Sequence, residues 1–256
     1  MKKLLQCIGF CVGFVALALV AALVVIHLTP PSNPHNYKTV GDIPAPPTYY
    51  RLDVDGFGKY LRSLPLKGRG SKIKLYSTGT PATIQAVNYA VIDVPLLSNA
   101  EQCADVCMRL RAEYLYQAGM PIAFHDVNNN VLKYEGNSRK EFEKYLRSLY
   151  KVASTYSLNR WMPQRQIQDM QPGDVFVYPA KHGKLGHAMM VIDVAENTSG
   201  EKVYMLAEGS TPARSIHIVY NLKNGWKTPW FTLDETADRI FASVCFYKKG
   251  QLKYFK

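Results

Sequence analysis

The apolar positions of residues 99–117 (NAEQCADVCMRLRAEYLYQ) recur with the spacing of an α-helix. They fall at i, i+3, i+4, i+7 and i+11, which places their side chains on one helical face. These positions are Cys103, Val106, Cys107, Leu110 and Tyr114. Ser98 and Glu101 have the spacing of a capping box, which predicts that the helix begins just before Cys103. The inward face of this helix then carries two cysteines one turn apart.

Two further stretches, residues 55–66 and 142–158, are amphipathic with helical spacing, and the first is broken at Pro65. From Trp161 onward the apolar runs are short and bounded by turn residues, which is typical of strands. Together with an earlier apolar run, the predicted strands are 84–94, 174–178, 187–194, 203–208, 215–220, 240–247 and 251–255. Helices followed by an antiparallel meander predict an α+β fold.

The N-terminus holds one long apolar run, residues 7–28, preceded by Lys2 and Lys3. It is longer than the ~7–15 residues of a signal-peptide core and reaches the roughly 20 residues that a membrane-spanning helix needs. We therefore expect residues 1–28 to form a signal anchor or transmembrane helix, with a cleaved signal peptide as the alternative. The two lysines place the N-terminus in the cytoplasm and the rest of the chain outside the membrane.

Residues 29–50 contain six prolines, which predicts a stiff, extended tether. Residues 51–256 then form one domain, long enough to bury a core. The formal net charge is +11, but the basic residues are scattered rather than massed. This distribution indicates a solvated surface, with attraction to an anionic envelope polymer or lipid headgroups as the functional alternative.

Three cysteines lie beyond the predicted anchor: Cys103, Cys107 and Cys245. An odd number cannot form a complete set of disulfides, and no Cys/His spacing is typical of zinc, so no metal or other cofactor is predicted. Cys245 lies in an apolar strand and is expected in the core. Cys103 lies at the helix start, where a thiolate is stabilised, whereas Cys107 is one turn deeper and expected to be inert. The alternative is that both thiols are buried small hydrophobes.

A histidine at the start of a predicted strand is the candidate base. His187 follows the Gly-rich loop AKHGKLG, so its ring can reach into a cleft and accept the thiol proton. Pairing Val194 with Val203 across the next hairpin places Glu208 on the His187 face, where it can accept the second ring N–H and orient the ring. Asp193 shares that predicted face but lies roughly 20 Å along the strand. The alternative for Glu208 is an ordinary carboxylate at a strand end.

The other histidines are weaker candidates because of their predicted surroundings. His125 and His182 lie in polar or Gly-rich loops, and His35 lies in the predicted tether. His217 lies in the middle of a predicted strand, where a histidine is usually a satisfied sheet residue.

The order of these features resembles that of NlpC-type papain-like cysteine peptidases. The matching positions are Cys103, the turn Pro172-Gly173-Asp174, His187 and Glu208. The chain departs from the usual Asp-Cys-Ser-Gly with Gln-Cys-Ala-Asp, and a predicted helical insert, residues 120–165, lengthens the gap between Cys103 and His187. The resemblance implies a bacterial envelope enzyme that cuts peptidoglycan stem peptides, or a related amidase or acyltransferase.

The chain is also similar, over nearly the whole predicted domain, to the domain of unknown function 4846 family of bacterial envelope proteins. The stretches that carry this similarity are FGKYLRSLPLK (57–67), QCADVCMRLRAEYLY (102–116), GDVFV, GHAMMVIDV, VYMLAEGSTPARSIHIV (203–219) and TPWFTL (228–233). This similarity implies a bacterial source and an exported domain, and it brings no established activity.

We therefore expect a membrane-anchored α+β domain facing the periplasm or cell exterior, with a papain-like helix packed on an antiparallel sheet. The expected activity is thiol hydrolysis or acyl transfer on peptidoglycan or related envelope material. Cys103 attacks, its backbone N–H helps to bind the oxyanion, His187 transfers the proton and Glu208 orients His187. Gln102 could supply a second oxyanion donor, but on a helix it would point about 100° away.

The expected partners are a cell-envelope polymer or peptide substrate and, through residues 7–28, the bacterial inner membrane. Nucleic acid is not expected for an exported domain. Two other classes of function remain open. The domain could be a non-catalytic envelope-binding module on a degenerate papain-like fold, or a structural protein whose basic surface contacts anionic headgroups.

Overall fold

The computed structural model describes residues 30–180, 185–225, 227–242 and 245–256. The chain divides into two compact units, residues 1–31 and 32–256, and the second contains all the elements described below. Within the described residues, no helix is long and apolar enough to cross a membrane. The predicted anchor, residues 7–28, lies outside the described part of the chain.

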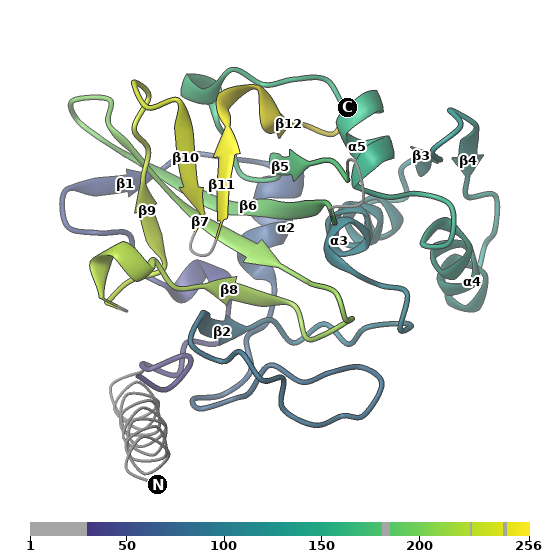
Figure 1. The fold of residues 1–256 in the computed structure, drawn as a ribbon, viewed down its shortest axis with the longest axis horizontal. Helices are drawn as coiled ribbons and strands as arrows, with labels where there is room; N and C mark the ends of the chain where they lie inside the picture. The colour runs from purple at the N-terminus through teal and green to yellow at the C-terminus, as the bar shows by residue number, and fades with distance from the viewer. Residues whose placement is uncertain (1–29, 181–184, 226, 243–244) are drawn as a thin grey trace, which may run out of the picture. The chain divides into compact units, whose positions relative to one another are not determined.

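The second unit is built on an eight-stranded antiparallel sheet (Figure 1). Its main path runs β12-β5-β6-β7-β8-β2, while β1 pairs with β6 and β9 pairs with β7. The strands are β1 (Tyr49–Arg51), β2 (Asn88–Val91), β5 (Val175–Tyr178), β6 (His187–Asn197), β7 (Lys202–Glu208), β8 (His217–Val219), β9 (Trp230–Thr232) and β12 (Leu252–Lys253).

Helices and two small hairpins surround this sheet (Figure 1). The α-helices are α2 (Gly56–Ser63), α3 (Cys103–Gln117), α4 (Arg139–Leu149) and α5 (Thr155–Trp161). The short 3₁₀ helices are η1 (Val40–Asp42), η2 (Ile167–Asp169), η3 (Leu222–Asn224) and η4 (Lys249–Gln251). The hairpins pair β3 (Ala123–His125) with β4 (Val131–Lys133), and β10 (Arg239–Ala242) with β11 (Cys245–Lys248).

Both faces of the sheet are buried. On one face, Met190 and Ile192 of β6 pack in a cluster with Leu110 of α3. On the other face, Met189 of β6 packs in a second cluster with Tyr247 of β11. Because successive residues of a strand point to opposite faces, a strand covered on both sides has apolar residues at consecutive positions, as the run AMMVI in β6 does. The predicted α+β class with an antiparallel sheet is therefore confirmed.

The predicted helix 142–158 is wrong, since it is two helices. α4 ends at Leu149 and α5 begins at Thr155. Between them Ser154 has extended backbone (φ −164°, ψ −176°), and its hydroxyl accepts the N–H of Tyr156 at 3.1 Å. This N-cap interaction stabilises a new helix start, which the apolar spacing alone does not show.

Strand predictions fail mainly where the strands are short. The predicted strand 240–247 is two strands, β10 and β11, that pair with each other. The predicted strands 84–94 and 251–255 are shorter, at β2 and β12, and the short strands β1, β3, β4 and β9 were not predicted. Strands of two to four residues carry too few alternating positions to produce a periodic signal.

The Pro-rich segment is packed from Ser32 onward and differs from the extended tether predicted for residues 29–50. Val40 and Ile43 are fully buried, and β1 pairs with β6. Asn33 donates from Nδ2 to the carbonyl oxygens of Tyr37 and Lys67, at 2.9 and 2.8 Å. The compact unit therefore begins well before residue 51.

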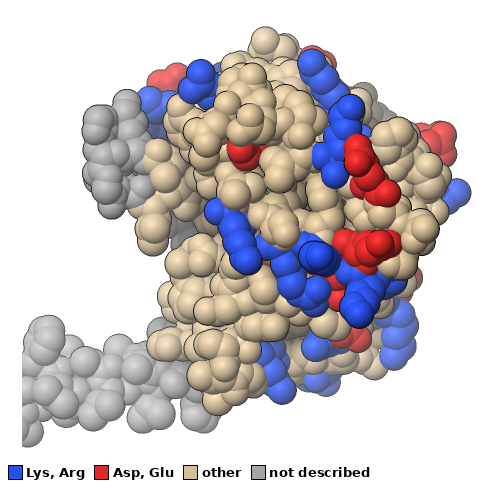
Figure 2. Space-filling model, turned by 90° about the vertical axis from the view of Figure 1, so that its right-hand side faces the viewer, with Lys and Arg blue, Asp and Glu red and all other residues tan. Residues whose placement is uncertain are grey.

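Basic side chains do not mass on the face shown in Figure 2, where Lys and Arg are interleaved with Asp and Glu. Ion pairs account for part of this pattern: Arg139 contacts Glu113 and Glu143, and Arg147 also contacts Glu143.

Candidate functional site

Helix α3 begins at Cys103 itself. Gln102 has extended backbone (φ −104°, ψ −158°), and its N–H donates to Oδ2 of Asp105 at 3.0 Å. The prediction that the helix begins just before Cys103 is therefore confirmed, but the capping residues are Gln102 and Asp105 and not Ser98 and Glu101. Ser98 and Glu101, with the predicted capping-box spacing, instead form a local turn in which the N–H of Glu101 donates to the Ser98 carbonyl.

This start places the Cys103 thiol in the first helical turn. The N–H groups of that turn have no acceptor within the helix, and the helix dipole favours negative charge there. Cys103 is 6% exposed, whereas Cys107 is fully buried and its thiol donates to the Cys103 carbonyl at 3.4 Å. Burial raises the pKa of Cys107 well above its ordinary value. Cys107 is therefore the more deeply buried of the two thiols.

His187, the first residue of β6, joins Cys103 to Glu208. Nε2 of His187 lies 2.6 Å from Oε2 of Glu208, which leaves Nδ1 for the thiol. Burial alone would lower the pKa of His187, but hydrogen bonds with Cys103 and Glu208 outweigh it and raise that pKa to about 10. The ring therefore holds its second proton strongly while it touches both partners.

The approach to His187 leaves no space for a side chain at Gly186. A Cβ atom there would lie 2.2 Å from Oγ1 of Thr155 and 2.7 Å from the carbonyl oxygen of Tyr178. The start of α5 is thus packed directly beside the start of β6. The backbone at Gly186, which leads into His187, is therefore held between Thr155 and Tyr178.

The strand register explains why Glu208 reaches His187. Near the site Met190 pairs with Ala207, which is the predicted register and puts Glu208 on the His187 face. Farther along, the prediction is wrong by one residue, because Val194 pairs with Tyr204 and not with Val203. The difference is a β-bulge between Val191 and Asp193.

Glu208 lies between two histidines. It pairs directly with His217 of β8, and Oε1 of Glu208 lies 3.3 Å from Nε2 of His217. Nε2 of His217 makes no hydrogen bond within the described residues, so the contact is electrostatic. Burial would raise the pKa of Glu208, but the hydrogen bond from His187 and the proximity of His217 lower it to about 2. The carboxylate therefore stays charged.

His217 is the residue of this site that the sequence analysis missed. Its ring is buried, and Nδ1 donates to the carbonyl oxygen of Ser215 at 3.1 Å. Because Nδ1 faces the Ser215 carbonyl, Nε2 is the ring atom that faces the Glu208 carboxylate. The pairing of Glu208 with His217 depends on the β7–β8 register. The sequence of the intervening segment, GSTPARSI (209–216), does not define that register.

The family of the chain follows from comparison with known proteins. A model of the domain of unknown function (4846) matches residues 41–137 and 133–254. The chain belongs to this family. No curated protein and no solved structure matches the chain. The match covers the sheet, helix α3 and each of the four residues Cys103, His187, Glu208 and His217.

In this member of the family, Gln102 is held beside Cys103. Oε1 of Gln102 accepts a hydrogen bond from Oγ1 of Thr211 at 2.7 Å. The premise that Gln102 points away on a helix is wrong, because the residue precedes α3. Gly209 packs against the same turn: a Cβ atom there would lie 2.5 Å from Cγ2 of Val106. The segment after Glu208 therefore fixes the position of the Cys103 turn.

The remaining candidates do not join this cluster. His125 stacks on Trp161, with ring centroids 5.6 Å apart, and bonds Asn129. His182 lies outside the described residues. Cys245 is half-buried, and burial raises its pKa to about 11.

The described residues include no group of three or more His, Cys, Asp or Glu side chains placed to hold a metal ion.

Proposed function

We propose that the chain is a thiol hydrolase or acyltransferase that forms an acyl-enzyme on Cys103. The observation that carries this proposal is the 2.6 Å contact between Nε2 of His187 and the Glu208 carboxylate, with the Cys103 thiol close enough to the same ring to raise its pKa. A nucleophile, a base and an orienting group in one chain of contacts is the arrangement that nucleophilic catalysis requires.

The reaction balances within these residues. Proton transfer from the Cys103 thiol to Nδ1 of His187 gives a thiolate beside an imidazolium, which is the protonated ring that the raised pKa of His187 favours. The thiolate attacks a carbonyl carbon. The C–S bond forms, and the negative charge moves to the carbonyl oxygen, where the N–H of Cys103 donates to it. His187 then protonates the leaving amine or alkoxide as its bond to carbon breaks. Water or another acceptor, deprotonated by His187, attacks the thioester and releases Cys103.

The substrate class we propose is an amide or ester of bacterial envelope material, and the fold we propose is papain-like. The order Cys103, Pro172-Gly173-Asp174, His187 and Glu208, with its resemblance to NlpC-type peptidases, supports this class. The net charge of +11 suits an anionic polymer. We further propose that residues 7–28 anchor the chain in the inner membrane, with the domain outside.

Selective alkylation tests the nucleophile first. Treatment of the folded chain with iodoacetamide near neutral pH, followed by peptide mass spectrometry, is expected to modify Cys103 alone. Cys107 and Cys245 are expected to react only after unfolding. Preferential labelling of Cys107 would show that the wrong thiol has been assigned.

Turnover is tested with muropeptides and the matched pair wild type and Cys103→Ser. We expect wild type to release new amine or ester products, and Cys103→Ser to be inactive with an unchanged melting temperature. Retained binding of muropeptides without turnover in wild type would contradict the enzyme and favour the binding module. Binding to anionic vesicles that disappears at high salt, without muropeptide binding, would favour the structural protein.

A further inference from the structure

A run of basic residues lies between α2 and β2, in the segment that Figure 1 shows leading into β2. Residues 56–92 contain six Lys or Arg residues and no Asp or Glu. Four of the six fall within residues 67–74 (KGRGSKIK), which we call the basic loop: Lys67, Arg69, Lys72 and Lys74. All four are exposed. The basic residues of the whole chain are scattered, so this loop is a local exception.

Most of the charge of the basic loop is not neutralised. Lys67 contacts Asp93 at 3.5 Å, but 43% and 51% of the two side chains stay exposed. A contact between two such exposed side chains is weak. Within the described residues, Arg69, Lys72 and Lys74 form no ion pair. The loop therefore presents close to its full positive charge to solvent.

The backbone of the basic loop holds Arg69 in a tight turn. The N–H of Ser71 donates to the carbonyl oxygen of Gly68 at 3.2 Å, and Gly70 has φ +79°. A positive φ at the third residue is what a type II turn requires, and glycine adopts it without strain. Because glycines flank Arg69 on both sides, no side chain next to it in the sequence covers it.

The basic loop is hydrogen-bonded to the residue at which the second unit begins. The carbonyl oxygen of Ser32 accepts the N–H of Gly70 at 2.8 Å, and the Ser32 hydroxyl donates to the carbonyl oxygen of Ser71 at 2.6 Å. Ser32 is only 7% exposed, so these bonds are shielded from water. The position of the loop is therefore coupled to the point at which the chain enters the domain.

The proposed membrane anchor, residues 7–28, ends four residues before Ser32. Four residues reach at most roughly 14 Å. The headgroup region on each side of the hydrocarbon core is about 5–8 Å thick. A chain anchored through residues 7–28 therefore has to keep Ser32, and the basic loop bonded to it, within a short reach of the lipid headgroups.

We propose that the basic loop binds anionic lipid headgroups of the membrane in which the chain is anchored. Headgroup phosphates accept hydrogen bonds from guanidinium and ammonium groups. Each Lys or Arg near an anionic membrane surface strengthens binding about 5-fold. The contact holds one face of the domain against the membrane. The proposal rests on the proposed anchor and is independent of the thiol chemistry.

Amine footprinting of the full chain in lipid nanodiscs tests this contact. The chain is placed in discs of phosphatidylcholine, or of phosphatidylcholine mixed equally with phosphatidylglycerol, and is acetylated and analysed by peptide mass spectrometry. Lys67, Lys72 and Lys74 should react at least about 5-fold more slowly in the anionic discs, which is the gain from one contact. High salt should remove the difference, because it screens exposed charges.

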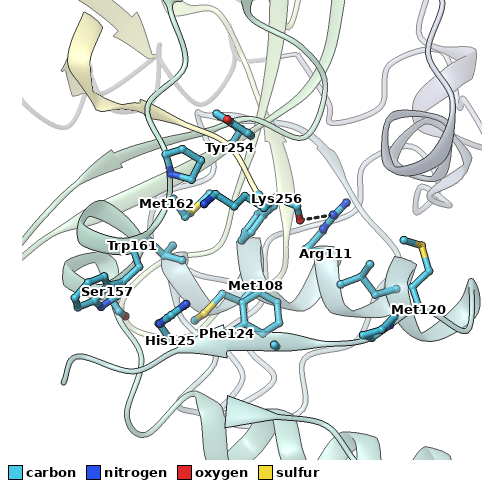
Figure 3. Close-up of a pocket in the computed structure, with 16 residues that line it drawn as sticks. Met108, Arg111, Met120, Phe124, His125, Ser157, Trp161, Met162, Tyr254 and Lys256 are labelled. Carbon is cyan, nitrogen blue, oxygen red and sulfur yellow. Dashed lines mark hydrogen bonds between the residues drawn. The ribbon is translucent and has the colours of Figure 1, made fainter. Parts of the chain in front are cut away.

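Lys256 is the internal control. It is exposed and follows β12, whereas the basic loop leads into β2, and these two strands are the opposite ends of the main path of the sheet. Its main-chain oxygen accepts a hydrogen bond from Arg111 at 2.9 Å, in a cavity that no residue of the basic loop lines (Figure 3). Its acetylation should proceed at the same rate in both kinds of disc.

A pair of double variants tests the charge of the loop. Arg69→Gln with Lys72→Gln removes two charges at exposed positions, so Lys67 and Lys74 should lose most of their protection in the anionic discs. Lys140→Gln with Lys144→Gln removes the same charge from exposed positions of α4 and should leave that protection unchanged.

Co-elution of the chain with lipid scores the anchor separately. A chain that does not co-elute refutes the anchor and the proposal built on it. An inserted chain whose loop lysines react equally in both discs, or whose Lys256 is slowed as much as the loop, overturns the proposal and leaves the anchor standing. Protection by added peptidoglycan fragments in neutral discs, with none from anionic lipid, would assign the basic loop to the envelope polymer instead.

Discussion

Replacing Glu208 by alanine tests the candidate site most directly, because it removes one of the two groups that hold the proton on His187. The Glu208 carboxylate lies 2.6 Å from Nε2 of His187. A hydrogen bond to a charged group contributes ~1.5–3 kcal/mol, and one pH unit of pKa corresponds to ~1.4 kcal/mol. We therefore expect the pKa of His187 to fall by about 1–2 pH units in Glu208→Ala.

The measurement is an NMR titration of histidine-labelled full chain, with the His187 resonance assigned by His187→Asn. Glu208→Gln retains an oxygen that accepts the ring N–H, so its effect on ring orientation should be smaller. Glu196→Ala is the matched control, because Glu196 is a carboxylate on β6, the strand that begins at His187, and its ion pair is with Lys202 and not with His187. If His187 titrates at the same pH in folded Glu208→Ala as in wild type, the orienting role of Glu208 is refuted.

The same variants order the activities. Cys103→Ser should abolish thiol chemistry, Glu208→Ala should reduce it strongly, and Glu208→Gln should reduce it least. The ordering follows from what each change removes: the nucleophile, the whole acceptor, or only its charge. His217→Asn extends the series, because it removes the second histidine beside Glu208 without touching His187. Reduced activity in His217→Asn, with the His187 pKa lowered and the fold intact, would identify His217 as a positioning residue.

Two further predictions concern stability. Gly209→Ala should lower the melting temperature, because the new Cβ would lie 2.5 Å from Cγ2 of Val106. Overpacking of this kind costs about 1–3 kcal/mol. Gly68→Ala is the control in thermal melts, because the nearest neighbour of its Cβ would lie at 3.5 Å. The pKa of Glu208 is lowered to about 2, so its contribution to the free energy of unfolding should be lost as pH falls from about 4.5 toward 2. The pKa of His187 is raised to about 10, so its contribution should be lost as pH rises from about 6.5 toward 10. Chemical denaturation of wild type and Glu208→Gln across pH checks this, and a stability difference that does not vary with pH would contradict it.

The strongly periodic parts of the sequence predicted the centre of the fold. Apolar spacing located α3 and the strands β5 to β8, and the placement of the β6–β7 turn put His187 and Glu208 on one face.

The parts that the sequence did not predict depend on contacts between distant segments. His217 reaches Glu208 through a β7–β8 register that no local signal encodes. The Pro-rich segment packs on the domain because Asn33 donates a hydrogen bond to the carbonyl oxygen of Lys67 and β1 pairs with β6. The cap of α3 was assigned to Ser98 and Glu101, whereas the structure caps the helix with Gln102 and Asp105 and Glu101 contacts Arg109.

The bulge in β6 resolves two conflicting demands on that strand. At its start, His187 must share a face with Glu208, which requires the register in which Met190 pairs with Ala207. Continued without interruption, that register would turn Asp193 toward the face covered by the β10–β11 hairpin. The bulge instead lets Asp193 contact Arg51 and Arg62, at 2.5 and 2.8 Å. A fully buried carboxylate without such partners would cost several kcal/mol. One extra residue therefore lets the same strand hold a buried ion cluster at one end and the candidate base at the other.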